Sequence, residues 1–155
     1  MPILQLTEEP DASEDDRSAV SQGLRDFDHR YMPRSDSQPL TLFLRDESGA
    51  ILGGLLASTR WHWLLVDKLW VTDERRGRGH GSALLERAEV IARSRGCRHA
   101  ALDTTEFQAR RFYEEVGYIV FGELDDCPPG SRTYWLRKSL NSVDSRARSG
   151  SIESA

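Results

Sequence analysis

The twenty residues 67–86 constrain this chain more than any other stretch. An apolar run ends at Val71, a basic and glycine-rich turn follows, and apolar residues then recur at helical spacing. This order predicts a strand, a loop and the first turn of a helix. The free backbone N–H groups at such a helix start attract anions, and glycines let the backbone come close to the ligand. Arg76 and Arg78 can add charge-assisted hydrogen bonds to a phosphate.

Two familiar phosphate loops do not fit this turn. It lacks the Gly-x-x-x-x-Gly-Lys-Ser/Thr pattern of nucleoside-triphosphate sites. Its glycines run Gly-x-Gly-x-Gly, and the preceding strand does not open a βαβ unit, which argues against a dinucleotide fold. On this stretch alone, a tight turn capped by a solvated basic helix end remains the alternative.

Size and composition restrict the class of protein. The 155 residues predict one domain, residues 1–140, followed by a disordered tail rich in Ser and Arg, residues 141–155. No apolar run is long enough to span a membrane and no signal peptide is evident, so a cytoplasmic protein without a membrane partner is expected. The net charge of −4 argues against general nucleic-acid binding. The four histidines, with Cys97 and Cys127, show no metal-ligand spacing, so no metal is expected.

Residue spacing predicts a mixed α/β domain. A short strand is expected over residues 3–7, and a helix capped at Asp11 or Ser13 that ends before Pro33. Val20, Leu24, Phe27 and Tyr31 mark one face of that helix. The later strands are expected at residues 40–45, 50–59, 61–71, 99–103, 118–123 and 132–138, with helices at 81–95 and 105–116.

The pairing of these strands follows from their connections. The turn at residues 46–49 joins an antiparallel hairpin, and Gly53-Gly54 in its second strand indicates a bulge or a close backbone neighbour. The strands that end at Val71 and Asp103 flank a crossover helix and should therefore be parallel.

A second motif gives the family. Five residues in the last expected helix and at the start of the strand after it match one pattern, namely Ala109, Phe112, Tyr113, Gly117 and Tyr118. Together with Arg76-x-x-Gly79-x-Gly81, this pattern resembles the GNAT superfamily of N-acetyltransferases. The resemblance implies a single GNAT-like domain with antiparallel N-terminal strands, a central parallel strand pair that splays apart, and flanking helices.

The resemblance also implies acetyl-CoA as co-substrate and assigns residues to its parts. Its pyrophosphate would be held by Arg76, Gly77, Arg78, Gly79, His80, Gly81 and Ser82. Its pantetheine arm would pair with the strand backbone at Leu69, Trp70 and Val71, close to Gln108 and Phe112. The sequence departs from the family at Glu106, where an Asn is frequent. Gln108 is a possible substitute, although it also completes a helix capping box with Thr105.

The reaction implied by the resemblance is direct attack of an amine on the thioester, through a tetrahedral intermediate. Tyr113 is the candidate general acid for the leaving thiolate, with a core tyrosine as the alternative. Asp67 is the candidate base, because alternation places it on the face of Leu69 and Val71 unless a bulge intervenes. An ion-pair role for Asp67 is the alternative, and Glu106 or a water chain are the other candidates for the base.

The resulting hypothesis is an N-acetyltransferase that acts on a primary amine of a small molecule or protein. The alternative is a non-catalytic acyl-CoA-binding sensor or scaffold, against which the retained Tyr113 argues. The acidic charge, with Trp61 and Trp63, hints at a cationic and partly apolar acceptor, although both rings could simply pack the sheet. A homodimer is compatible with such a fold, but no sequence feature requires one.

Overall fold

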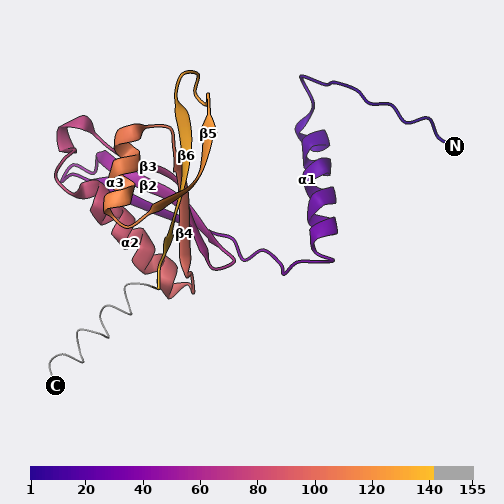
Figure 1. Cartoon of the computed structure of the whole chain (residues 1–155). Helices are drawn as coiled ribbons and strands as arrows, with labels where there is room; N and C mark the ends of the chain where they lie inside the picture. The colour runs from indigo at the N-terminus through magenta and orange to yellow at the C-terminus, as the bar shows by residue number, and fades with distance from the viewer. Residues whose placement is uncertain (142–155) are drawn as a thin grey trace. The chain divides into compact units, whose positions relative to one another are not determined.

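The computed structural model describes residues 1–141 and divides the chain into two compact units, residues 1–35 and 36–155 (Figure 1). The first unit holds one helix, and the second holds a six-stranded sheet with two further α-helices. Apart from residue 141, the tail expected over residues 141–155 lies outside the described residues.

The helix of the first unit, α1 (Glu14–Asp28), begins at Ser13. Between the two expected caps the structure selects Ser13, whose Oγ accepts a hydrogen bond from the Asp16 amide at 3.1 Å. The expected apolar face is exposed along its whole length, and no residue of α1 is buried. Tyr31 lies beyond the helix end, with its ring centroid 5.2 Å from that of Phe27.

The prediction of a strand over residues 3–7 is wrong. These residues pair with no strand of the described chain, and the side chains of Ile3, Leu4 and Leu6 are exposed. A strand is defined by its ladder to a neighbour, so an apolar, β-prone segment without a sheet edge stays irregular.

The sheet of the second unit is mixed, as expected. Its strands are β1 (Gln38–Arg45), β2 (Ile51–Arg60), β3 (Trp63–Val71), β4 (His99–Thr104), β5 (Ile119–Asp125) and β6 (Arg132–Ser139). Their order is β1-β2-β3-β4-β6-β5, and only β3 and β4 run parallel. The helix α2 (His80–Ser94) makes the crossover that this parallel pair needs.

The central parallel pair splays apart after three residues. Its register ends at Leu65 opposite Ala101, whereas β3 continues to Val71 and β4 to Thr104. Beyond that point the two strands face a gap rather than each other. The predicted splayed pair is thereby confirmed.

A bulge in β3 changes which residues share a face. Val66 pairs with Ala57 and Lys68 pairs with Leu56, so Asp67 is left between them without a partner residue. Val66 and Val71 are buried, but Asp67 is exposed. The expected alternation of Asp67 with Leu69 and Val71 is therefore wrong, because the extra residue shifts the register.

The paired glycines in β2 lie against neighbouring backbones. This agrees with the second of the two interpretations from the sequence, a close backbone neighbour. A Cβ on Gly53 would lie 2.8 Å from the carbonyl oxygen of Trp70, and one on Gly54 would lie 2.9 Å from that of Leu42. The missing side chains let β2 approach both neighbours closely, including the last residues of β3.

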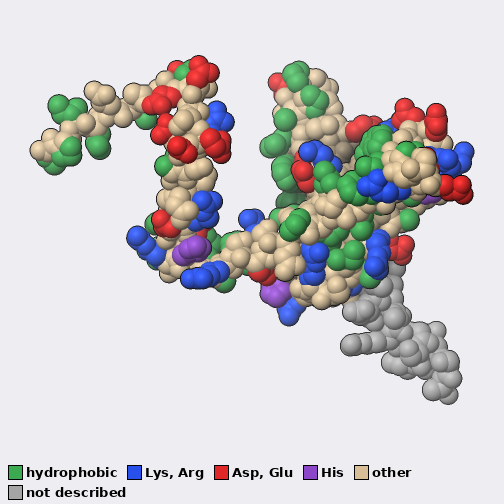
Figure 2. All heavy atoms as spheres, turned by 180° about the vertical axis from the view of Figure 1, so that it is seen from behind, with side chains coloured by type: hydrophobic (Ala, Val, Ile, Leu, Met, Phe, Trp, Pro, Cys, Tyr) green, Lys and Arg blue, Asp and Glu red, His purple; other side chains and the backbone are tan. Residues whose placement is uncertain are grey.

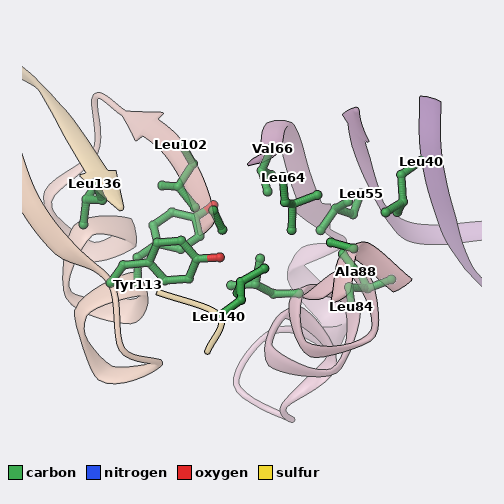
Figure 3. Close-up of a cluster of buried hydrophobic side chains, with 14 of the residues drawn as sticks. Leu40, Leu55, Leu64, Val66, Leu84, Ala88, Leu102, Tyr113, Leu136 and Leu140 are labelled. Atoms are coloured by element: carbon green, nitrogen blue, oxygen red, sulfur yellow. The ribbon is translucent and has the colours of Figure 1, made fainter. Parts of the chain in front are cut away.

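Two helices cover one face of the sheet. The helices α2 and α3 (Phe107–Glu115) lie on the same side in Figure 1. Both contribute to one buried cluster with the strands, and Figure 3 shows Leu84 and Ala88 of α2 beneath Leu40 and Leu55, with Tyr113 of α3 near Leu102 and Leu136. No helix within residues 36–141 covers the opposite face. Figure 2 shows hydrophobic side chains at the surface of this unit in patches broken by charged residues.

The cap of α3 differs from the expected capping box. The N-cap is Glu106, not Thr105, and its carboxylate accepts hydrogen bonds from the amides of Gln108 at 2.9 Å and Ala109 at 2.6 Å. A carboxylate at a helix N-terminus also interacts favourably with the helix dipole, which accounts for the one-residue shift.

A buried ion pair ties α2 to the last strand. The Nζ of Lys138 on β6 lies 2.5 Å and 3.2 Å from the two carboxylate oxygens of Glu89 on α2. The Glu89 side chain is 4% exposed and that of Lys138 is 16% exposed. Removing one partner of such a pair leaves the other charge buried and uncompensated.

We therefore expect Glu89→Gln to lower the free energy of unfolding by about 3–5 kcal/mol. The double variant Glu89→Leu with Lys138→Met should recover most of that loss, because neither charge remains. Urea titration measures both effects. Glu114→Gln, which breaks the more exposed Arg110–Glu114 pair, is the control and should cost much less. Equal losses for Glu89→Gln and Glu114→Gln would contradict the expectation.

Candidate active site

The gap between β3 and β4 opens onto a pocket of about 800 Å³. The pocket is formed by the end of β3, the glycine-rich loop, the first turn of α2 and the first turns of α3. Its lining residues are Leu69, Trp70, Val71, Arg75, Arg76, Gly77, Gly79, His80, Gly81, Ser82, Glu106, Gln108, Ala109, Phe112 and Tyr113. The structure thus brings together most of the residues that the two sequence motifs selected.

The loop presents free backbone donors to this pocket. Gly77 has φ 72° and Gly79 has φ 82°, a left-handed conformation that places Gly79 as the N-cap of α2. Along the start of α2, Ala83 is the first residue whose backbone amide has a backbone acceptor. It donates to the carbonyl of Gly79. Within the described chain, the amides of residues 79–82 have no such acceptor. The site therefore has the donors and the positive helix end that a phosphate group requires.

The arginines of the loop differ in position. Arg76 lines the pocket, and its Nε donates to the Val71 carbonyl at 3.2 Å and lies 3.2 Å from Asp73 Oδ1. These contacts hold the guanidinium at the end of β3, with its other N–H groups available. Arg75 also lines the pocket, although it belongs to neither of the two sequence motifs. Arg78 was expected in this site but is not among the lining residues.

Tyr113 lies at the inner end of the pocket. Its side chain is buried, and its ring makes edge contacts with Phe112 at 5.1 Å and Tyr118 at 5.9 Å between centroids. Figure 3 shows it beside Leu102 and Leu136, on the side of the cluster away from Leu40. Burial, followed by the negative charge of Asp103, raises the pKa of Tyr113 to about 12. The phenol therefore keeps its proton at neutral pH.

The three candidate polar residues occupy different places. Glu106 lines the pocket, but its carboxylate accepts the two amide hydrogen bonds that cap α3. Gln108 also lines the pocket, and its side chain makes no capping bond within the described residues. Asp67 lies outside the lining, at the bulge, with its Oδ2 3.6 Å from Lys68 Nζ and both side chains 71% exposed.

The aromatic residues suspected of lining an acceptor pocket lie elsewhere. Trp61 is in the β2–β3 turn and Trp63 begins β3, at the end opposite the pocket. Trp63 stacks on His99 with centroids 4.6 Å apart, so the packing interpretation fits it. The loop at residues 126–131 joins β5 to β6 and does not line the pocket either.

With this geometry in view, comparison with known proteins identifies the family. A family model described as the acetyltransferase (GNAT) family matches residues 4–118. The chain belongs to the GNAT family. The acetyltransferase activity predicted from the two motifs is thereby confirmed.

Relatives of this GNAT chain include an acetyltransferase whose name gives its substrate. It is 38% identical over 130 residues to a blasticidin-S acetyltransferase of Streptomyces morookaense, a match that covers 81% of this chain and 92% of the relative. A solved structure of a candidate acetyltransferase from Agrobacterium tumefaciens is 31% identical, with a TM-score of 0.82 and coverage of 88% and 99%. An acetyltransferase structure from Bacillus cereus is 27% identical, with a TM-score of 0.79 and coverage of 86% and 97%.

The described residues contain neither a metal-binding cluster nor a membrane-spanning helix. No group of three or more His, Cys, Asp or Glu side chains within residues 1–141 is arranged to hold a metal ion. None of the described helices is both long and apolar enough to cross a membrane.

We expect Gly79→Ala to weaken acetyl-CoA binding about tenfold, as the loss of one hydrogen bond to a charged group would. The added Cβ opposes the left-handed conformation that aims the free amides. Gly96→Ala is a matched control, because Gly96 has φ 89°, equally open surroundings and a place at the other end of α2. Calorimetric titration with acetyl-CoA measures both, and similar affinity losses in the two variants would contradict this interpretation of the loop.

We also expect the Tyr113 phenol to ionise late. A pKa raised to about 12 means that the folded protein holds this proton after the unfolded chain, with an ordinary pKa near 10, has lost it. This contribution to stability is complete below about pH 10 and is lost as pH rises towards 12. The phenolate absorbance of wild type minus Tyr113→Phe should stay flat to about pH 11 in the native protein and rise near pH 10 in denaturant. A native midpoint near 10 would contradict the assignment.

Proposed function

We propose that this GNAT enzyme transfers the acetyl group of acetyl-CoA to a primary amine of a small molecule. The observation that carries the proposal is one continuous pocket, which joins the free amides at the start of α2 to the buried phenol of Tyr113 at the splayed strands. One end suits a pyrophosphate and the other suits the departure of a thiolate.

The residues present fit acetyl-CoA. The amides of residues 79–82, with Arg76, would hold the pyrophosphate, and the left-handed Gly79 leaves open space for it. Residues 69–71 of β3 lack a neighbour on the side of the gap, so their backbone can pair with an extended pantetheine arm. Arg78 belongs to the proposed loop by sequence, and its long side chain can reach the phosphates from outside the pocket lining.

Acetyl-CoA supplies an activated thioester, and the chain's own groups make it react. A backbone N–H near Leu69 to Val71 would polarise the acetyl carbonyl and stabilise negative charge on its oxygen. Tyr113 would donate its proton to the thiolate as the carbon–sulfur bond breaks. The raised pKa of Tyr113 suits this role, because the acid form is present throughout the physiological range.

The amine must lose a proton to attack, and three groups are candidates to accept it. Asp67 lies two residues past the last β3–β4 pair, and its exposed carboxylate is the candidate base from the sheet face opposite α2 and α3. Glu106 is less suited, because its carboxylate caps α3. A water chain through the gap is the third candidate.

The relatives support a small-molecule acceptor. The chain is similar along most of its length to an enzyme named for acetylation of the antibiotic blasticidin S.

The proposal includes a cytoplasmic location, where acetyl-CoA is available. It also includes a homodimer, which gel filtration with light scattering tests. A non-catalytic acyl-CoA-binding module is the competing function. An assay of thiol release from acetyl-CoA separates this module from the enzyme.

The decisive assay measures thiol release from acetyl-CoA with a panel of amines that comprises a polyamine, an aminoglycoside, an amino-acid amide and blasticidin S. We expect turnover with at least one class and a roughly tenfold or larger fall in kcat for Tyr113→Phe, in the range typical of general acid catalysis. Tyr134→Phe, on β6 of the same unit and not among the residues that line the pocket, should retain full activity. An unchanged kcat in Tyr113→Phe would remove Tyr113 from the proton transfer. Tight binding of acetyl-CoA without turnover would favour the binding module.

A further inference from the structure

On the face of the sheet opposite α2 and α3, the end of β4 borders the gap where its pairing with β3 has stopped. On β4, Ala100 and Leu102 are buried in the core beneath the helices, so Ala101 and Asp103 lie on the opposite face. Ala101 is the last β4 residue paired with β3, which leaves Asp103 beside the gap where the strands have parted. Asp103 was not singled out from the sequence as a site residue, although it is an acidic residue at the end of an apolar strand.

Asp103 lies close to the reacting end of the pocket. Figure 3 shows Tyr113 beside Leu102, the residue that precedes Asp103 on β4. After burial, the negative charge of Asp103 contributes to the raised pKa of Tyr113. The pocket reaches Tyr113 from the side of the helices, and Asp103 approaches it from the other side of the sheet.

The carboxylate of Asp103 is available for a ligand. Within the described residues it forms no hydrogen bond and no ion pair, and its side chain is exposed. Arg137, on the same face in register with Ala101, lies over the ring of Phe121 at 5.6 Å instead of pairing with Asp103. By contrast, Asp67 across the gap has Lys68 beside it.

An aromatic ring stands directly beside this carboxylate. Trp135 of β6 is the register partner of Asp103, so the two side chains lie on one face of the sheet as a cross-strand pair. Trp135 is 40% exposed and its neighbour Leu136 is buried, which confirms that its ring is on the open face. A carboxylate next to an indole ring suits an ammonium group on an apolar carbon chain, through an ion pair and a cation–π contact.

The geometry points to Asp103 and Trp135 as the binding site for the ammonium group of the acceptor, which enters the β3–β4 gap from the face opposite acetyl-CoA. This inference rests on the proposed function and adds the class of substrate. It selects primary alkylamines that carry a positive charge at neutral pH. It also brings the attacking nitrogen towards the thioester from the side that the pantetheine arm leaves open.

The test compares Asp103→Asn, Asp103→Glu and Trp135→Leu with wild type, using calorimetric titration of each panel amine into protein saturated with coenzyme A. Loss of one charge-assisted contact should weaken amine binding about tenfold in Asp103→Asn, whereas Asp103→Glu should stay within about threefold of wild type. Trp135→Leu should weaken it severalfold. Glu86→Gln, which removes an exposed carboxylate from α2, is the control and should bind as wild type does.

Steady-state kinetics then separate substrate binding from disturbance of the fold. In Asp103→Asn the KM for the best amine should rise about tenfold while the KM for acetyl-CoA stays within about twofold. Equal rises in both constants, or an amine affinity equal to that of Glu86→Gln, would overturn the inference. Failure of the proposed function looks different, because wild type would then release no thiol although amine binding still depended on Asp103. Absence of amine binding by wild type would also overturn the inference.

Discussion

The parting of β3 from β4 is the constraint on which the site depends. Backbone N–H and C=O groups in the middle of a sheet normally pair with a neighbour, and leaving them open costs free energy unless another partner takes their place. Here the pairing stops after Leu65 and Ala101, while both strands continue. The unpaired edge of β3 is therefore where we propose that an extended ligand pairs, and this edge lines the pocket below the helices.

The surrounding structure holds this gap open. On one side, Gly53 lets β2 lie tightly against the end of β3 and fix its position, and Gly54 lets β2 lie tightly against β1. On the other side, β6 pairs with β4 along the full length of β4, up to Thr104. The crossover helix α2 packs on β1, β2 and β3, and the buried Glu89–Lys138 pair connects it to β6. Both strands are thus anchored away from the gap, and neither needs the other beyond Ala101.

The two helix starts complete the site with different chemistry. The amides of residues 79–82 leave the first turn of α2 electropositive and open to an anion. The free amides at the start of α3 also need acceptors, and there the carboxylate of Glu106 accepts their hydrogen bonds. One helix start is thereby free for a ligand and the other is closed, which keeps α3 fixed and holds Tyr113 in place at the gap.

The sequence alone determined the order of most elements, the parallel strand pair, the glycine-rich loop and the family, because each of these depends on local spacing. Periodicity, turn residues and motif positions are visible in one chain without knowledge of its neighbours. The same reasoning selected Arg76, Gly79 and Tyr113, and the structure places these three residues in the lining of one pocket. Only the tertiary structure decided features that depend on pairing between distant segments. The bulge that turns Asp67 away from Val71 appears only in the register with β2. Among residues 1–141, residues 3–7 find no partner strand, and Asp103 comes to face Trp135 only because β6 inserts between β4 and β5. Strand register and insertion are set by contacts between remote residues, so spacing along one chain does not reveal them.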